Sequence, residues 1–523
     1  MKYSTTNKTS ERVLPITLIL LTALVVSELI SSVTWRMAHD TPLLHYTAYL
    51  VDRHDYVPYQ DVFAINMPGT ILFHLCIGKL FGYGDLAFRL TDIVYLLFLL
   101  ALTWKLMVCF GRRVAWGAVL LFGGIYLGSG PAMSLQRDYL GILPIAAAVL
   151  LSNSVLGERV NTYVRAVVVG ALFGLSASIK PHLAIGLPVV VVFMATAIPN
   201  GSSRNAALIR SVLKYGVVSI GGFLLVIALP IVWLSRNGGL LEFWAMSTRY
   251  LPLYLKLIGE HEVMSGFKRW AQIYDSYRQF GGHAVLLASG VLGTYMALFE
   301  TKLSSRQSRL VVLLAVLTLL YSTYPVLAGQ FFNYHWMPFT YFASLLAALL
   351  LRPFPTESQA GLRRGFAVLM FLFLIITTVR PASPFVRQLS GGEPAPPGHG
   401  RVDEIAGFLG THLMPDDRVQ PLDWTSGAVH ALLLSHARVA TPFVYDFHFY
   451  HHVSDPYIQN LRRKFITLLE REKPRFLVLM SDKDRPIGED TTTEFPELER
   501  FVDANYHVVL EGDGYAVLEI SSH

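Results

Sequence analysis

Hydrophobic runs of close to twenty residues recur along the first 380 residues, and they limit what the chain can fold into. Roughly twenty apolar residues in a helix cross the ~30 Å hydrocarbon core of a bilayer. Only 15% of the residues are charged, against roughly a quarter in a soluble domain. We therefore expect a polytopic α-helical membrane protein with about eleven transmembrane helices. The expected spans are residues 13–33, 85–108, 114–130, 138–156, 165–180, 182–198, 215–235, 283–299, 310–328, 337–352 and 365–379.

The basic residues of the short loops predict the orientation of these spans. Lys and Arg concentrate in loops on the cytoplasmic side of a membrane, and here they lie in every second expected loop. They are Arg112, Arg113, Arg159, Arg165, Arg204, Arg210, Lys214, Lys302, Arg306, Arg309, Arg352, Arg363 and Arg364. The first span is long and lacks an Ala-x-Ala cleavage site, so it is expected to be an anchor. The N-terminus is then cytoplasmic, and the loops 34–84 and 236–282 and the C-terminal residues face outward.

The composition changes after the last expected span. Residues 380–400 are rich in Pro, Gly and Ser, which is typical of a linker between the membrane domain of residues 1–379 and a second domain. Residues 401–523 have helical spacing at 403–413 and 455–473 and strand-like runs at 475–480 and 515–520. We expect a small α/β domain outside the cytoplasm.

Charge and motifs exclude several classes of partner. Residues 380–523 hold 14 basic and 21 acidic side chains, so the acidic tail argues against nucleic-acid binding. The remaining residues hold 29 basic and 16 acidic side chains, a balance that suits anionic membrane lipids and phosphate groups. No P-loop and no GxGxxG after a strand is present, so nucleotide cofactors have no support.

The first external loop carries a series of short motifs. They are His39-Asp40-Thr41-Pro42, Pro58-Tyr59-Gln60-Asp61, Asn66-Met67-Pro68-Gly69, Leu80-Phe81-Gly82 and Phe88-Arg89-Leu90. Carboxylates near the end of a transmembrane helix are costly unless they are paired, hydrated or used in chemistry. Over residues 35–90 the order and spacing resemble the integral-membrane glycosyltransferases of the GT-C superfamily. The similar branch holds protein O-mannosyltransferases and lipid A aminoarabinose transferases.

This resemblance implies transfer of a sugar from a polyprenyl-phosphate donor to an extracytoplasmic glycan, lipid or protein, with inversion favoured. An acceptor hydroxyl must lose its proton as it attacks the sugar, and a carboxylate can act as the general base. Asp40 is the leading candidate and Asp61 the second. Because the leaving group is a phosphate monoester, fixed cations suffice to stabilise it. No cofactor is required, and a divalent metal has no support in the sequence.

Further candidates come from loops on the expected outer face. The cations for the donor phosphate are Arg89, Arg137, Lys180, Arg249 and Lys256, with Lys268 and Arg269 in the same long loop as the last two. The candidates for substrate contact are His39, Tyr59, Asp138, His182, Tyr334 and His335. The segments 135–138, 178–182 and 332–338 also resemble motifs in uncharacterised bacterial membrane proteins grouped with these transferases.

Both carboxylates also have a structural interpretation. Asp40 precedes Thr-Pro, so it can cap the helix that begins there. Asp61 follows Pro-Tyr-Gln and can close a turn through its side chain. Capping does not exclude catalysis.

The other candidates have structural interpretations as well. Arg89 can pair with Asp92, three residues later on one helix. Arg137 and Asp138 can pair with another loop. Lys180 can extend its ammonium group from a helix end to the interface, and His335 fits an aromatic belt at the membrane surface.

Two aromatic segments complete the set of expectations. Residues 236–282, with Trp244, Tyr250, Tyr254 and Trp270 among basic residues, resemble an amphipathic element on the membrane surface or a lid over the donor phosphate. The histidines of residues 445–452 favour a surface loop over a metal site, because no second ligand cluster accompanies them.

Two functions from other classes compete with the transferase. A lipid or sugar transporter would have its site near the midplane and often two repeated halves, whereas here the charges gather on one face and repeats are absent. A non-catalytic membrane scaffold would only display residues 401–523 outside the membrane and would carry out no reaction. If the chain is a transferase, the bacterial cytoplasmic membrane is its expected location. The sequence leaves the sugar, the acceptor and the length of the lipid open.

Overall fold

The computed structural model describes residues 4–153, 161–196, 204–259, 261–353, 357–378, 384–481 and 485–521. The chain divides into two compact units. Unit 1 comprises Met1–Thr34, Asp92–Leu229 and Asp275–Glu393, and unit 2 comprises Trp35–Thr91, Pro230–Tyr274 and Pro394–His523. Each unit is therefore assembled from segments that are far apart in the sequence.

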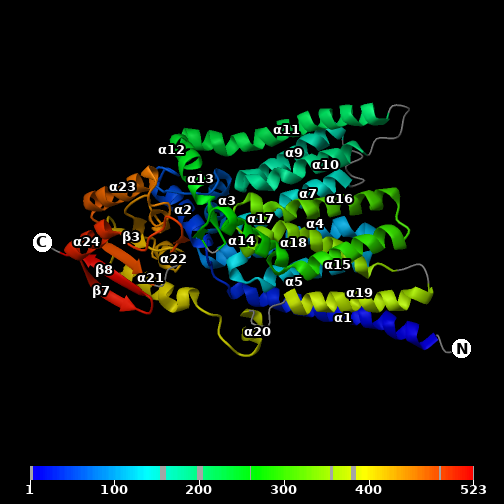
Figure 1. The fold of residues 1–523 in the computed structure, drawn as a ribbon. Coiled ribbons are helices and arrows are strands. Elements are labelled where there is room, and N and C mark those ends of the chain that lie inside the picture. Colours follow the sequence, from blue (N-terminus) through cyan, green and yellow to red (C-terminus); the bar gives the residue numbers. More distant parts are fainter. Residues whose placement is uncertain are drawn as a thin grey trace. The chain divides into compact units, whose positions relative to one another are not determined.

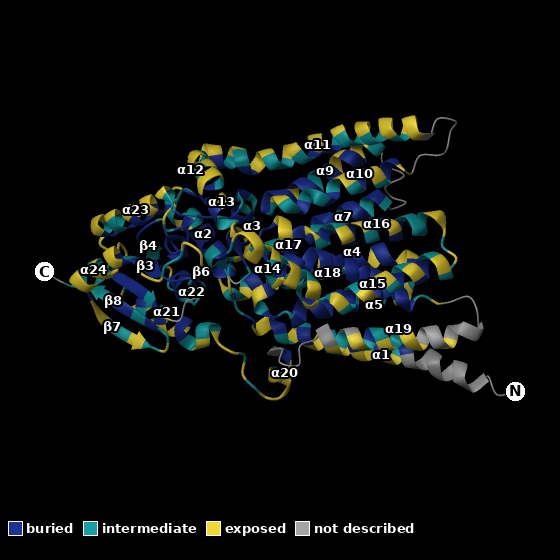
Figure 2. Cartoon of the chain, viewed as in Figure 1, coloured by how far each residue is buried: buried dark blue, intermediate teal, exposed yellow. Residues whose placement is uncertain are grey.

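Unit 1 is helical (Figure 1). Its helices are α1 (Ser4–Ser31), α5 (Arg112–Gly128), α6 (Arg137–Leu140), α7 (Ile142–Asn153), α9 (Thr162–Ile179), α10 (Leu187–Ala195), α15 (Ala284–Tyr295), α16 (Ser305–Ser322), α17 (Tyr324–Leu327), α18 (Met337–Ala348), α19 (Glu357–Thr378) and α20 (Pro384–Leu389). Three more helices continue into unit 2, namely α4 (Asp85–Met107), α11 (Arg204–Arg236) and α14 (Gly266–Gln279). Every residue of α18 is buried, and it packs against α5, α15 and α16. In Figure 2 α18 is dark blue, so it forms the centre of this unit.

Six described helices are long and apolar enough to cross a membrane. They are Leu14–Thr34, Asp85–Phe110, Thr162–Ile179, Asn205–Arg236, Ser305–Leu327 and Asn333–Leu351. A seventh span arises if Gly266–Gly282 and Ala284–Glu300, bent by 67°, count as one. The protein is thus an integral membrane protein. The other expected spans coincide with α5, α7, α10 and α19 as far as the described residues reach, and the count of eleven stays a prediction.

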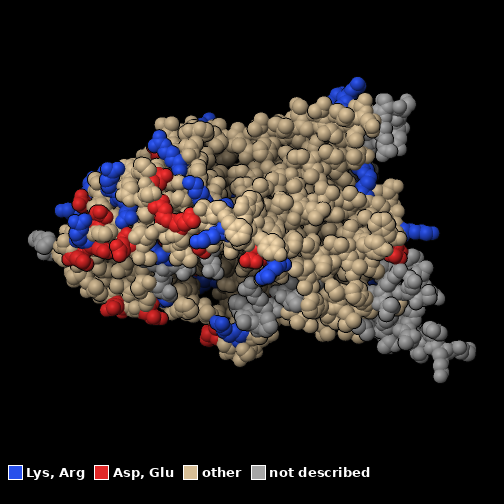
Figure 3. Space-filling model, viewed as in Figure 1, with Lys and Arg blue, Asp and Glu red and all other residues tan. Residues whose placement is uncertain are grey.

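The outward faces of these helices are apolar. The span Asn205–Arg236 is mostly exposed in the isolated chain, with Leu224, Leu225 and Leu229 on its surface. In Figure 3 the face of the helical unit is largely without charge, whereas Lys, Arg, Asp and Glu side chains gather over the sheet and helices of unit 2. Exposed apolar surface of this extent indicates contact with lipid.

Unit 2 contains a five-stranded sheet in the order β4-β3-β5-β8-β7. The strands are β3 (Arg418–Leu422), β4 (Arg438–Val439), β5 (Phe476–Met480), β7 (Tyr506–Gly512) and β8 (Tyr515–Ile520). Strand β3 is parallel to β4 and β5, and β8 is antiparallel to β5 and β7. The helices of this region are α21 (Arg401–His412), α22 (Ala428–Leu434), α23 (Pro456–Glu472) and α24 (Pro496–Asn505). The predicted helices at 403–413 and 455–473 and the predicted strands at 475–480 and 515–520 are confirmed; β3, β4 and β7 were not predicted.

The first loop packs on this sheet region within unit 2. Its helices are α2 (Thr41–His54) and α3 (Pro68–Phe81). The Tyr46 hydroxyl donates to the Ala437 carbonyl at 2.8 Å, and the Phe63 amide donates to the Pro442 carbonyl at 2.8 Å. One hydrophobic core joins residues 59–71, 234–253 and 422–498. The two compact units therefore have other boundaries than the domains predicted from the sequence, residues 1–379 and 401–523. The predicted domain division stays a prediction.

Candidate active site

Asp40 stands at the N-cap position of α2, but its side chain makes no capping hydrogen bond. The neighbouring Thr41 closes the turn instead, because its hydroxyl donates to the Ala38 carbonyl at 2.7 Å and accepts from the Ala38 amide at 3.2 Å. The Asp40 carboxylate lies 3.3 Å from Nδ1 of His39 and is 17% exposed. Asp40 therefore occupies the predicted N-cap position, but its carboxylate does not cap the helix.

His261 is a further neighbour of Asp40 that the sequence did not single out. Its ring packs on Trp424, with centroids 4.1 Å apart. Burial lowers the pKa of His261 to about 4; the Asp40 charge opposes this shift and His39 adds to it. His261 is consequently neutral at neutral pH, and its positive charge is not available to hold the Asp40 carboxylate.

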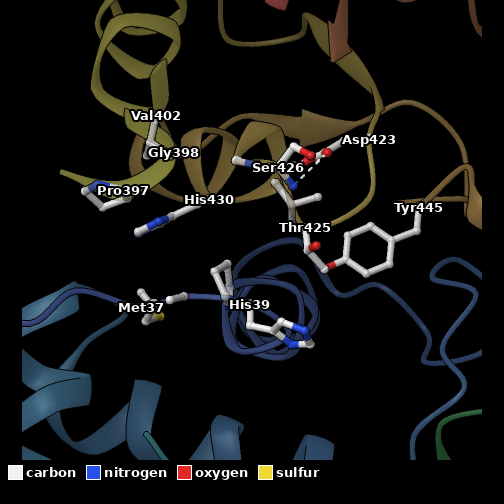
Figure 4. A pocket seen from close by; sticks show the side chains of 14 residues that line it. Met37, His39, Pro397, Gly398, Val402, Asp423, Thr425, Ser426, His430 and Tyr445 are labelled. Carbon is white, nitrogen blue, oxygen red and sulfur yellow. Dashed lines mark hydrogen bonds between the residues drawn. The ribbon is translucent and has the colours of Figure 1, made fainter. Parts of the chain in front are cut away.

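A small cavity of about 170 Å³ has His39, the residue before Asp40, in its wall (Figure 4). We call it the His39 pocket; its lining includes Met37, His39, Asp423, Thr425, Ser426, His430 and Tyr445. It is smaller than the roughly 300–1,000 Å³ of pockets for drug-sized ligands. The hydroxyls of Thr425, Ser426 and Tyr445 make part of its wall polar.

The Asp423 carboxylate closes the turn that leads into α22. The Asp423 carboxylate accepts hydrogen bonds from the amides of Ser426, Gly427 and Ala428 at 2.9, 3.2 and 2.9 Å. Ser426 and Gly427 precede α22 and Ala428 is its first residue, so the carboxylate accepts from amides that have no helical carbonyl before them. Thr425 is held at φ +55°, a left-handed conformation that a threonine adopts only where the surrounding bonds impose it.

Asp85 holds the chain before Asp40 against the sheet region. Its carboxylate accepts from the Met37 amide at 2.9 Å and from Arg36 Nε at 2.6 Å. His430 Nε2 lies 3.0 Å from the same carboxylate. Because Arg36 also bonds Asp403 at 2.8 Å, the segment that leads to His39 is fixed on two sides.

Asp61 and Tyr59 have structural roles in the same loop. Asp61 Oδ2 accepts from the Val57 amide at 2.8 Å, and the Asp61 amide donates to the Val57 carbonyl at 2.8 Å, so the side chain closes a turn. Tyr59 is buried in the hydrophobic core, and its hydroxyl donates to the Asn66 carbonyl at 2.5 Å. The second carboxylate and this tyrosine thus shape the loop, and their catalytic and substrate roles stay predictions.

A second cluster of candidates lies in unit 1 around Lys180, the residue that ends α9. Lys180 Nζ donates to both oxygens of Asp138 at 2.8 and 3.0 Å. Asp138 is fully buried and also accepts from the Tyr324 hydroxyl at 2.6 Å. The predicted pairing of Asp138 with another loop is confirmed. Asp138 holds the ammonium group of Lys180 in a fixed place.

Aromatic rings surround this ion pair. Lys180 Nζ lies 5.5 Å from the ring centre of Tyr324 and 5.7 Å from that of Tyr334, within the range of cation–π attraction. His335 is buried, and its Nδ1 lies 2.6 Å from the Gln330 carbonyl, to which it donates. His182 meets the edge of Tyr324. Three segments that the sequence proposed separately are therefore brought together.

The remaining cations have varied surroundings. Arg89 is buried with its guanidinium 4.5 Å from the ring centre of Trp35, and Asp92, its expected partner, accepts from the Tyr126 hydroxyl at 2.5 Å. Arg249, Lys256 and Lys268 are exposed. Arg269 bonds the Lys256 carbonyl at 2.8 Å, so it fastens the long loop to itself.

The long loop forms the short helices α12 (Leu240–Ala245) and α13 (Leu251–Tyr254) and the hairpin β1 (Leu257–Ile258) and β2 (Glu262–Val263), and it continues into α14. Trp244 and Trp270 are exposed, as expected of a surface element. Tyr250 is buried in the hydrophobic core instead, and its hydroxyl lies 2.5 Å from His448 Nδ1 and 2.9 Å from His451 Nε2.

The histidines of residues 445–452 do not form the surface loop that we expected. His448, His451 and His452 are all buried, because the aromatic residues between them pack into the core of unit 2 and take the histidines with them. The described residues contain no group of three His, Cys, Asp or Glu side chains arranged to hold a metal ion. Hydrogen bonding to Tyr250 is the role that the geometry gives His448 and His451.

The sequence analysis missed functional candidates that lie far from Asp40 in the sequence. Asp85 and His430 are 345 residues apart, and the hydroxyls of Thr425, Ser426 and Tyr445 stand in a region that looked like an ordinary α/β domain. No local spacing connects them to Asp40. The spacing of Asp423 and Ser426, which is typical of a turn, was the one local signal in the sequence for this part of the pocket.

Comparison with known proteins shows a likeness of fold. No family model matches the chain, and no curated protein sequence matches it. Two crystal structures of ArnT from Cupriavidus metallidurans are similar to it over 96% of this chain and 97% of theirs. The structure bound to undecaprenyl phosphate gives a TM-score of 0.60 at 11% identity, and the apo structure gives 0.61 at 12%. The resemblance to GT-C transferases predicted from residues 35–90 is thus confirmed as a resemblance of fold.

Proposed function

We propose that the protein is a membrane glycosyltransferase that moves a sugar from a polyprenyl-phosphate donor to a hydroxyl of an extracytoplasmic glycan, lipid or protein. The observation that carries this proposal is the placement of Asp40 next to His39, which lines a small pocket of unit 2 with hydroxyls in part of its wall. The fold shared with ArnT, whose crystal structure holds undecaprenyl phosphate, supports the class of donor. By the same analogy the protein resides in the bacterial cytoplasmic membrane with residues 401–523 outside.

Asp40 acts as the general base in this proposal. The acceptor oxygen attacks the anomeric carbon and gives its proton to the carboxylate of Asp40, while the bond between the anomeric carbon and the phosphate oxygen breaks. The bonding electrons leave with the lipid phosphate. His39, 3.3 Å from Asp40, orients the carboxylate or contacts the acceptor in the His39 pocket.

The cations of unit 1 receive the departing phosphate. Negative charge grows on the phosphate as the bond breaks, so a fixed positive charge stabilises the transition state more than the bound donor. Lys180 suits this role because Asp138 and two tyrosine rings hold its ammonium group. Arg137, directly before Asp138, is the second cation.

The test is release of polyprenyl phosphate from a lipid-linked sugar by the purified chain in detergent. Donors with different sugars are supplied with a mixture of envelope glycans and lipids, and the freed polyprenyl phosphate is measured. We expect release that depends on acceptor and is lost in Asp40→Asn. A transporter would leave the donor intact, as would a scaffold. Donor that remains uncleaved by the wild-type chain with every sugar and acceptor tried would refute the proposal.

A further inference from the structure

A groove on the side of unit 1 runs between α10 and α16, and none of the residues assigned to sugar transfer lines it. Its volume is about 650 Å³. We call it the α10–α16 groove; it is lined by Pro188, Val189, Val192, Phe193, Thr196, Ser308, Arg309, Val312, Leu313 and Val316. Most of these side chains are aliphatic, and Val312 is 50% exposed. The groove is therefore an apolar channel on a surface that the membrane covers.

One end of the α10–α16 groove is cationic. Arg309 Nη2 donates to the Phe193 carbonyl at 2.8 Å and to the Thr196 hydroxyl at 3.1 Å, which fixes the guanidinium at the last turn of α10. Nε of Arg309 is buried and has no hydrogen-bond partner among the described residues. The described chain also places no carboxylate within 4 Å of this guanidinium. The N-terminal end of α16 adds partial positive charge at the same place.

A second groove on unit 1 provides a contrast. The α15–α19 groove has a volume of about 630 Å³, and its lining is also mostly apolar. It is lined by Leu292, Tyr295, Met296, Glu300, Gly361, Gly365, Phe366 and Leu369. Its charged residue is Glu300 instead of an arginine. The two grooves are thus similar in volume and in their apolar lining. They differ in the sign of the charged residue, which is positive in the α10–α16 groove and negative in the α15–α19 groove.

We propose that the α10–α16 groove binds an anionic phospholipid, with the phosphate at Arg309 and an acyl chain along the valines. The groove residues from Arg309 to Val316 cover about 10 Å of helix at 1.5 Å per residue, enough to guide the first part of a chain. Basic pockets between transmembrane helices on the cytoplasmic side recognise anionic headgroups, and the predicted topology places Arg309 on that side. A zwitterionic lipid brings its own ammonium group, so it gains less from Arg309.

Native mass spectrometry of the full chain in detergent tests this site. The chain is titrated with phosphatidylglycerol and, separately, with phosphatidylcholine of the same acyl chains. We expect the first bound lipid to show a roughly tenfold preference for phosphatidylglycerol, the scale of one charge-assisted contact. Arg309→Gln should remove this preference, Arg309→Lys should keep most of it, and Val312→Trp should block the groove for both lipids.

Matched controls separate this site from general lipid binding. Leu369→Trp fills the α15–α19 groove and should leave the preference unchanged, as should Arg113→Gln, which changes an exposed basic residue at the start of α5. If Arg309→Gln fails to fold because its bonds to α10 are lost, Val312→Trp decides, since it leaves those bonds in place. Equal affinity for the two lipids would overturn the proposal. So would a preference that survives Val312→Trp, or a first lipid that is displaced by polyprenyl phosphate but not by phosphatidylglycerol.

Discussion

The surroundings of Asp40 and of Lys180 differ in how tightly each charge is held. Asp138, the partner of Lys180, is fully buried and accepts hydrogen bonds from Lys180 and Tyr324. Asp40 stays partly exposed, with His39 at 3.3 Å, and His39 lines a pocket with hydroxyls in its wall. A fixed ammonium group suits the binding of a phosphate, whereas a general base must reach an acceptor and exchange protons with it. The Lys180 cluster therefore suits the binding of a phosphate, and the surroundings of Asp40 suit a general base.

The largest expected effect is that of Asp40→Asn. An amide cannot accept the acceptor's proton, so we expect turnover to fall by roughly two to four orders of magnitude, the usual range for a general base. Binding of the donor should change little, because the lipid phosphate is assigned to the cations of unit 1. Transfer in a reconstituted assay and binding of polyprenyl phosphate measure the two effects separately. Near-normal transfer by a folded Asp40→Asn protein would show that Asp40 is not the general base.

The next effect concerns the Lys180 cluster. We expect Lys180→Ala to weaken binding of polyprenyl phosphate by about 1–3 kcal/mol, through loss of a charge-assisted contact. This variant also leaves Asp138 buried without its cation, which costs stability. The double variant Lys180→Ala with Asp138→Asn removes both charges, so it should recover stability but not affinity. Recovery of affinity in the double variant would show that Lys180 serves the fold and not the donor.

The fold was easier to predict than the site because its signals are local. Apolar length and basic loops predicted the membrane helices, and the spacing of residues 455–473 predicted α23. The site depends on contacts across the chain, such as Asp85 with His430 and Tyr46 with Ala437. Local spacing contains no information about such pairs. The motif of residues 445–452 shows the same limit, since its histidines are buried because this segment packs into a core built from residues far away in the sequence.

A third effect comes from the buried histidines of unit 2. Burial lowers the pKa of His448 to about 3 and places that of His451 well below its usual value, against about 6.5 in the unfolded chain. The unfolded state therefore binds more protons below pH 6.5, so stability is complete above that pH and falls as the pH decreases. We expect a loss of about 1 kcal/mol per histidine between pH 6.5 and 5.5. Thermal unfolding at a series of pH values measures it.

Two substitutions isolate this contribution. His448→Gln keeps a hydrogen-bonding group near Tyr250 but does not titrate, so it should reduce the dependence of stability on pH. His412→Gln changes an exposed histidine of the same unit and should leave that dependence as it is. Identical pH dependence in His448→Gln and the wild type would mean that His448 is protonated at the same pH in the folded and unfolded chain.

The smallest expected effect, that of Asp61→Asn, sharpens the comparison within one loop. Asp61 and Asp40 are both carboxylates of the first loop, yet the Asp61 side chain is engaged by the Val57 amide, 2.8 Å away. An asparagine oxygen can accept the same hydrogen bond, so we expect a stability loss below about 1 kcal/mol, the net value of one neutral hydrogen bond, and transfer within a few-fold of wild type. Thermal unfolding and the transfer assay, run beside Asp40→Asn, give both numbers. A loss of transfer as large as that of Asp40→Asn, in a protein of unchanged stability, would show that the second carboxylate takes part in the chemistry and that the turn is not its main role.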